Sequence, residues 1–426
     1  MISSKIQYMR DGPMKISELT DEVLARNMEF ELRDARTNRM GELIGDRMAN
    51  FAASELLRVE VRVQEEGIFQ WESIEEFNVS ANIGNPTARY INRRPRIYDI
   101  ASESSFQMTK EWLSTCHSSH DSCPPMNLVQ LPTRVIDVGT STSDQQRLIT
   151  TNSILGNYAA LSYCWGGEPQ PLITSKSNVE TLSNNIPTSL LAKTIREAIF
   201  VTRQLGLRYI WIDAICIIQD SAADRDVELT RMGEIYEMAA ITIVAASAKH
   251  CKQGFLQRRS YPWGPTDPYF TGDQPINHRG WTLQEFLLPP RKLIYSATQL
   301  MWQCNSAQAE LGNSAKKAGD PFSSLDQKLD AKTMHDIRFN WQVLIQNYSS
   351  RSLTNKDDML PGISGIASKF ARFLREEYKA GLWYSESDKS NFVQELLWIV
   401  QKHEEVSLLD WAQSNRYTAP SWSWAG

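Results

Sequence analysis

The chain has 426 residues, two to three times the length of an ordinary domain, so we expect two or three subdomains rather than one core. Hydrophobic residues make up 42% of the chain and charged residues 22%, which excludes wholesale disorder. The 45 basic and 50 acidic residues give a formal net charge of −5, which argues against nucleic acid or an anionic membrane as the main partner.

The sequence favours a cytoplasmic protein of the reducing compartment. Its 6 cysteines are too few and too scattered for a disulfide scaffold of this size. The opening residues contain no apolar segment of the kind found in a secretory signal. No run reaches the ~18 apolar residues that a membrane span needs.

Four regions follow from the changes of pattern along the chain. Residues 1–105 form an accessory region, in which Glu42 to Leu57 is compatible with a helix and Leu57–Val63 alternates like a strand. Residues 106–150 form a segment that precedes the main domain, which we place at 151–305. Residues 306–426 are mostly helical after a polar surface excursion at their start, and an end at Gly426 suits a natural short form and a truncation equally.

Strand and helix patterns alternate in the main domain. The expected order is strand, helix, strand, helix, strand, over Tyr158–Cys164, Thr188–Leu205, Tyr209–Ile218, a helix opened by Ser221 and Asp224, and Ile241–Ala246. A helical segment at Arg279–Leu288 and a strand from Lys292 to Tyr295 follow. This alternation predicts an α/β fold with a parallel sheet and flanking helices, and right-handed crossovers make a flavodoxin-like arrangement the economical choice.

Ligands of parallel sheets bind beyond the carboxyl ends of the strands, where the first strand is followed by Trp165, Gly166 and Gly167. Glycines let backbone amides approach a ligand closely. A tight turn beside a packed indole explains the same residues.

Asp213 lies within an almost continuously apolar segment. A carboxylate buried there costs several kcal/mol unless it is paired or hydrogen-bonded. We favour a structural ion pair with Arg208, Arg279 or Arg291 over a position in a pocket.

Glu285 follows Trp281 by four residues, so the two side chains share one face of a helix. An acid beside a large indole is partly desolvated, which raises its pKa toward neutrality. The alternative is a glutamate on the helix surface, or one bound to Arg279 or Arg291.

Cys116, His120 and Cys123 are residues of the types that bind zinc. Their spacing is irregular and a further ligand pair is missing, so we expect packed thiols and a histidine at a helix end rather than a metal. The motifs of serine hydrolases, zinc hydrolases, P-loop enzymes and dinucleotide-binding dehydrogenases are absent, which disfavours all four classes.

Three blocks together resemble the fungal heterokaryon incompatibility (HET) domain. They read YAALSYCWG from Tyr158, LRYIWIDAICIIQD within Leu207–Gly254, and RGWTLQEFLLPPRKLIY over Arg279–Tyr295. Relatives often carry Val where Cys164 stands. The resemblance implies a role in fungal non-self recognition and programmed cell death, through other incompatibility or signalling proteins or through self-association.

HET domains are in turn remotely similar to TIR domains, many of which carry a Trp-Cys-x-x-Glu helix that serves NAD⁺ cleavage. Here Trp281 and Glu285 have the same separation, with Thr282 in place of the cysteine. No cofactor is firmly implied, but the likeness makes NAD⁺ a candidate substrate and Glu285 the candidate catalytic residue. The residues expected to bind that substrate are Trp165, Gly166, Gly167, Asp213, Arg279 and Trp281.

Two other functions remain open from the sequence. A HET-like enzyme of a secondary-metabolite pathway, such as a cyclase, would use the tryptophan-rich loops to bind an apolar molecule. A purely structural interaction protein is the third alternative.

Overall fold

The computed structural model describes residues 97–141, 145–259, 274–311, 329, 333–397 and 419–425, and the backbone of strands at 29–34, 56–65, 68–78 and 316–317. The chain divides into two compact units, one made chiefly of residues 1–96 and the other of residues 97–311 and 315–426. Most of the helix expected at Glu42 to Leu57 lies outside the described residues.

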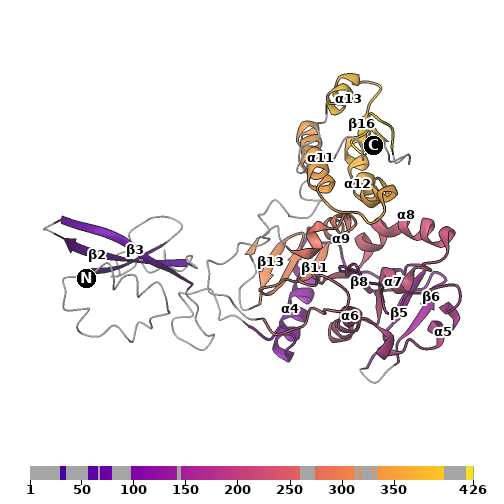
Figure 1. Ribbon diagram of the computed structural model, residues 1–426, viewed down its shortest axis with the longest axis horizontal. Helices are drawn as coiled ribbons and strands as arrows, with labels where there is room; N and C mark the ends of the chain where they lie inside the picture. The colour runs from indigo at the N-terminus through magenta and orange to yellow at the C-terminus, as the bar shows by residue number, and fades with distance from the viewer. Residues whose placement is uncertain are drawn as a thin grey trace. The chain divides into compact units, whose positions relative to one another are not determined.

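The first unit contains a three-stranded antiparallel sheet in the order β1-β2-β3 (Figure 1). Its strands are β1 (Glu29–Asp34), β2 (Leu56–Glu65) and β3 (Ile68–Asn78). The strand expected at Leu57–Val63 is confirmed as part of β2.

The second unit is built on a nine-stranded mixed sheet whose centre is parallel. The four parallel strands, in spatial order, are β9 (Tyr209–Trp211), β8 (Tyr158–Ser162), β10 (Ile241–Val244) and β11 (Arg291–Tyr295). Their chain order across the sheet is therefore second, first, third, fourth. The burial of every residue of β8 and β10 explains why these two strands read as apolar runs without alternation, whereas the fully buried β11 begins with Arg291 and Lys292.

Antiparallel strands extend this centre on both sides. Beyond β9 lie β5 (Arg134–Asp137) and β6 (Arg147–Thr150), and beyond β11 lie β12 (Leu300–Cys304), β13 (Ala307–Glu310) and β14 (Lys316–Lys317). The sequence indicates a proline-bounded strand that ends at Val138, and β5 confirms it. The other edge strands were not indicated, and the surface excursion expected after residue 306 is wrong where β13 joins the sheet. A separate two-stranded sheet pairs β4 (Val129–Gln130) with β7 (Leu155–Gly156).

Helices cover both faces of the sheet. Helices α4 (Glu103–Ser119) and α6 (Lys193–Gln204) lie on one face, where the rings of Phe106 and Phe200 pack 5.6 Å apart, and α8 (Ala222–Met238) and α9 (Thr282–Leu287) lie on the other (Figure 1). A shorter helix, α5 (Val179–Asn184), precedes α6. The expected helix from Thr188 thus begins five residues late, after a 3₁₀ turn at Thr188–Leu190.

The strand expected over Tyr209–Ile218 is wrong beyond Trp211. The backbone N–H groups of Ile215 and Cys216 bond back to the Ile212 carbonyl, and the chain forms a short helix, α7 (Asp213–Cys216). A short apolar run cannot distinguish a buried strand from a buried helical turn. As a consequence, Asp213 lies just beyond the carboxyl end of β9 rather than inside it.

The capping box expected at Ser221 and Asp224 does not form. The Ser221 side chain makes no capping bond, and the Asp224 carboxylate accepts hydrogen bonds from Arg134 and from the Ile218 backbone. Asp224 therefore bonds to Arg134, 90 residues away in the sequence, instead of forming a capping box with Ser221.

The last part of the second unit is mostly helical, as expected. It contains α11 (Met334–Ser349), α12 (Ser364–Leu374), α13 (Lys389–Glu395) and a hairpin of β15 (Glu377–Lys379) and β16 (Leu382–Tyr384). Helix α12 packs on α8 at Gly233 and Gly365, so closely that a Cβ on Gly233 would lie 2.7 Å from the Gly365 Cα.

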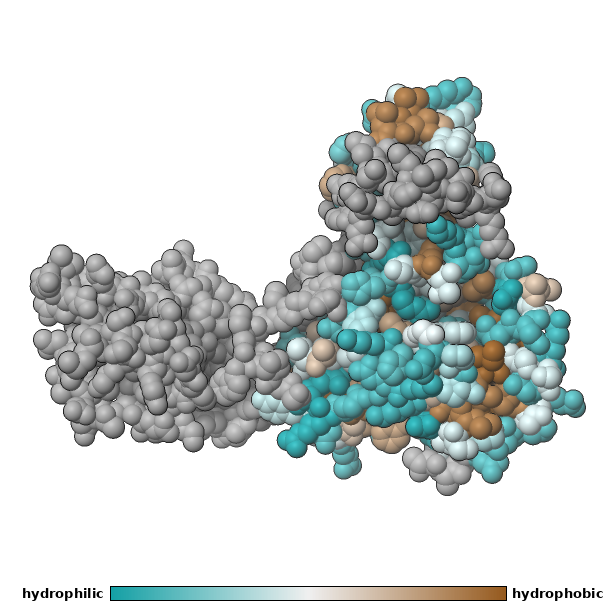
Figure 2. Space-filling view, viewed as in Figure 1, coloured by the Kyte–Doolittle hydropathy of each residue, from teal (hydrophilic) through white to brown (hydrophobic). Residues whose placement is uncertain are grey.

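The described surface in Figure 2 is mostly hydrophilic, with hydrophobic residues gathered in a few small groups. Among the described helices, none combines the length and the apolar character that crossing a membrane requires.

Candidate functional site

A group of polar side chains lies at the carboxyl ends of β8 and β9, beside α9. Ser162 is the last residue of β8, Asp213 is the first of α7, and Glu285 is in the middle of α9. Parallel neighbours end at the same edge of a sheet, which brings residues from distant parts of the chain together. We call Ser162, Trp165, Asp213, Arg279 and Glu285 the polar cluster.

The outer layer of the polar cluster is the pair formed by Trp165 and Asp213, both partly exposed. The indole N–H of Trp165 donates to Asp213 Oδ2 at 2.7 Å, and the Ala214 backbone N–H donates to Oδ1 at 2.7 Å. Desolvation raises the pKa of Asp213, against the opposing effects of the Arg279 charge and the Trp165 hydrogen bond.

The inner layer is centred on Glu285, which is 4% exposed. The Ser162 hydroxyl donates to Glu285 Oε2 at 2.6 Å. The Tyr236 hydroxyl, from α8, lies within hydrogen-bonding reach of the same carboxyl and donates to the Leu161 carbonyl at 2.8 Å. Burial raises the pKa of Glu285 to about 7, with a further upward contribution from the Asp213 charge, although Arg279 and Ser162 act in the opposite direction.

Arg279 supplies positive charge to both layers without pairing with either carboxylate. Its Nη1 donates to the Tyr163 carbonyl at 2.5 Å. No ion pair between described residues includes Arg279, Asp213 or Glu285.

The ion pair expected for Asp213 is therefore wrong. Arg208 pairs with Asp137 at 2.9 Å, and the buried Arg291 bonds to a cysteine sulfur instead. The sequence could not anticipate this outcome, because the early end of β9 moves Asp213 from the interior of a strand to the edge of the sheet.

Trp281 and Glu285 have different partners. The Trp281 indole N–H donates at 3.0 Å to Asp358, in the C-terminal part of the unit, and its ring lies beside Gly362. The desolvation of Glu285 comes with its burial between β8 and α8, whereas Trp281 connects α9 to the segment that precedes α12.

The two glycines after Trp165 are exposed, and they differ in whether the backbone requires a glycine at that position. Gly166 has φ +85°, and a Cβ there would lie 2.3 Å from His250 Cβ, so the turn itself requires glycine. Gly167 has no neighbour within 4 Å of a Cβ. The tight-turn interpretation therefore accounts for Gly166.

Sequence reasoning missed three residues around Glu285. Ser162 lies in the first block, where its position at a strand end was a usable signal. Tyr236 and Arg351 come from α8 and from beyond α11, and no local pattern marks them. Arg351 Nη1 donates to Thr282 Oγ1 at 3.3 Å, and burial lowers its pKa to about 10.

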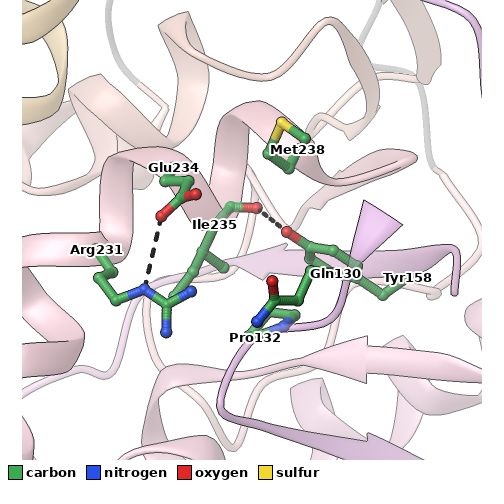
Figure 3. Close-up of a pocket in the computed structure, with 7 residues that line it drawn as sticks. All are labelled: Gln130, Pro132, Tyr158, Arg231, Glu234, Ile235 and Met238. Carbon is green, nitrogen blue, oxygen red and sulfur yellow. Dashed lines mark hydrogen bonds and ion pairs between the residues drawn. The ribbon is translucent and has the colours of Figure 1, made fainter. Parts of the chain in front are cut away.

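A small pocket lies at the opposite end of β8 from the polar cluster (Figure 3). Tyr158, the first residue of β8, donates to the Ile235 carbonyl at 2.6 Å beside it, and Arg231 pairs with Glu234 at 3.5 Å. Its volume of about 70 Å³ is well below the ~300 Å³ of a small ligand site, so it is too small for an ordinary ligand.

The structure also brings Cys116, His120 and Cys123 together, and it adds Cys304 from β12 to the group. This second cluster lies near the end of α4, apart from the polar cluster, and is considered below.

These features define an α/β domain with a charged, largely buried polar cluster at the carboxyl ends of its parallel strands. Residues 158–273 match the family described as "Heterokaryon incompatibility protein (HET)", so the chain carries a HET domain. The matched range includes Trp165 and Asp213 and ends before α9, which carries Glu285. No curated protein and no solved structure gives a significant match to the chain.

Proposed function

We propose that this protein is a cytoplasmic signalling module of fungal non-self recognition, and that it promotes cell death by hydrolysing NAD⁺ at the polar cluster. The HET domain supports the first half of the proposal. The second half rests on one observation: Glu285 and Asp213 lie beside Arg279 but form no ion pair with a described residue, and their burial raises the pKa of both carboxyl groups. The second-first-third-fourth order of the parallel strands supports a flavodoxin-like, TIR-like core.

The reaction suits a carboxylate of this kind. The bond between C1′ of the ribose and the nicotinamide nitrogen breaks, and both electrons leave with neutral nicotinamide. An ionised Glu285 stabilises the oxocarbenium-like ribosyl cation that remains. Water then adds to C1′ and releases a proton, so that NAD⁺ and water give nicotinamide, ADP-ribose and a proton.

Substrate reaches Glu285 by way of the outer layer. Glu285 is 4% exposed, while Trp165 and Asp213 above it are partly exposed. Separation of the indole from Asp213 opens a path to Glu285 and frees the Trp165 ring to stack on a base or on nicotinamide. Arg279, also partly exposed, supplies a cation for the pyrophosphate.

The ionisation of Glu285 sets the pH dependence of this activity. Since its pKa is raised to about 7, the carboxyl group is protonated and inactive in mildly acidic solution. Hydrolysis should rise with pH through neutrality and then level off.

The test is hydrolysis of NAD⁺ by the purified full chain over a series of protein concentrations, with nicotinamide and ADP-ribose measured separately. Glu285→Gln should lose about a hundredfold or more of the rate. Glu234→Gln is the matched control, because Glu234 lies exposed on α8 and should leave the rate unchanged. Equal rates in Glu285→Gln and wild type, or no hydrolysis at any concentration, would sink the proposal. Toxicity in cells that survives Glu285→Gln would point to assembly without catalysis.

A further inference from the structure

Four side chains from two distant segments meet near the end of α4. Cys116 is in the last turn of this helix, His120 is its C-cap residue, and Cys123 follows in the next turn. Cys304, the last residue of β12, is 184 residues from His120. One potential ligand atom from each of the four lies within 4.8 Å of the other three.

The distances are those of a tetrahedral metal site. His120 Nδ1 lies 3.4 Å from Cys304 Sγ and 3.8 Å from Cys123 Sγ. Zinc bonds of ~2.3 Å to sulfur and ~2.0 Å to nitrogen, at tetrahedral angles, separate such ligand atoms by about 3.5 Å. All three cysteines are buried and free of disulfides, so their sulfur atoms are available as ligands.

The charge around this cluster supports a bound cation held by thiolates. Arg291 is 2% exposed, and its Nε donates to Cys116 Sγ at 3.2 Å. Its Nη2 donates to the Pro124 carbonyl, and no described acidic residue pairs with it. A buried guanidinium without a counter-charge costs several kcal/mol. Three thiolates with one Zn²⁺ carry a net charge of −1, which would neutralise Arg291.

Neighbouring groups hold the loop around the sulfur atoms. The Ser306 hydroxyl lies 3.5 Å from Cys123 Sγ, and Asn305 Nδ2 donates to the Ser122 carbonyl at 3.1 Å. Such outer contacts orient ligands in protein metal sites. They come from the turn after β12, so both segments that supply ligands also contact each other directly.

We propose that Cys116, His120, Cys123 and Cys304 bind a structural zinc ion that fastens α4 to β12. Four protein ligands leave no open position for substrate, which makes the site structural rather than catalytic. The sequence indicated three of the ligands, but packed thiols were favoured because no fourth ligand was in sight. The fold supplies the fourth ligand, Cys304, from β12, which lies far from α4 in the sequence.

The first test is the zinc content of the purified full chain, measured by mass spectrometry of the metal. We expect about one zinc per chain in wild type and in Cys251→Ser, a buried free cysteine outside the cluster. Cys304→Ser should lose the metal during dialysis against a chelator that wild type resists, while Cys304→His should retain it. Equal retention of zinc in Cys304→Ser and wild type would overturn the assignment.

A second test needs only the wild-type chain, in case Cys304→Ser fails to fold. Replacement of the metal by Co²⁺ should give the intense visible bands of tetrahedral coordination and a near-ultraviolet thiolate band. Wild-type protein that folds free of metal and gives no such spectrum overturns the proposal. A disulfide among Cys116, Cys123 and Cys304 in protein purified under reducing conditions would do so too.

Discussion

Two groups of buried or partly buried carboxylates lie around strand β9, and their surroundings are opposite. In the first group each acid has an arginine: Asp224 accepts two hydrogen bonds from Arg134 Nη2, and Asp137 accepts 2.9 Å bonds from Nε and Nη2 of Arg208. Although burial alone would raise the pKa of Asp137, the bonds from Arg208 outweigh it and lower that pKa below its ordinary value.

In the second group, Asp213 and Glu285 have hydroxyl, indole and backbone donors but no ion pair, and their pKa values are raised. Acids whose charge is fully compensated by an arginine stabilise a framework, and that role does not require them to titrate near neutral pH. Acids that are buried and left partly uncompensated cost stability, and proteins keep such groups chiefly where function uses them. This contrast separates the structural carboxylates of the domain from its candidate active centre.

The largest expected effect comes from breaking a compensated pair. Asp224→Ala removes the two short hydrogen bonds of Arg134, which is 7% exposed, and leaves its buried charge only Glu228, at 4.0 Å. We expect a loss of about 3–5 kcal/mol in the free energy of unfolding, measured by urea denaturation. Asp226→Ala, at an exposed position of the same helix, is the control and should change stability by less than about 0.5 kcal/mol. A loss as small as that in Asp224→Ala would remove the distinction between the two groups.

An intermediate and pH-dependent effect is expected at Glu285. Its pKa is raised from 4.5 in the unfolded chain to about 7 in the folded one, so the folded state holds the extra proton between these values. Wild type therefore loses stability as the pH rises from about 5 to about 8, whereas Glu285→Gln lacks this loss. The stability of the variant relative to wild type should increase by roughly 2–3 kcal/mol over that range. A difference that does not change with pH would mean that Glu285 titrates at its ordinary value.

The smallest effect on stability is expected at Asp213. Asp213 forms no ion pair, so Asp213→Asn leaves no unpaired charge, but it keeps only one of the two oxygen acceptors that the Trp165 indole and the Ala214 N–H use. The change should lower the free energy of unfolding by about 1 kcal/mol, less than Asp224→Ala. The same change should reduce the rate of NAD⁺ hydrolysis, since it alters the outer layer above Glu285. A large fall in melting temperature without loss of activity would return Asp213 to a structural role.

The parallel centre of the sheet could be predicted because its strands are buried on both faces and separated by short links and helices. Of the antiparallel strands at the edges, β5 was indicated by its apolar segment after a proline, whereas the short segments of β6 (RLIT) and β13 (AQAE) are too polar to be recognised as strands. The end of β9 at Trp211 was also out of reach, because the helical turn after it is as apolar as the strand.

The residues of the candidate site likewise divide into those that the sequence could predict and those that it could not. Three of its residues could be found from local patterns. Trp165 precedes a glycine turn, Asp213 is a charged residue in an apolar run, and Glu285 follows Trp281 at helical spacing. Tyr236, Arg351 and Cys304 become neighbours of their clusters only through the fold, and nothing in their own segments marks them. The partner of Trp281 was equally unpredictable, since Asp358 follows it by 77 residues.

The most direct measurement is the titration of the Glu285 carboxyl group itself, by infrared difference spectra of wild type against Glu285→Gln over a range of pH. A carbonyl band of a buried, protonated acid should disappear with a midpoint at about pH 7 and be missing from the variant. A midpoint near the ordinary value of 4.5 would show that the pKa of Glu285 is not raised, and the polar cluster would then be framework rather than active centre.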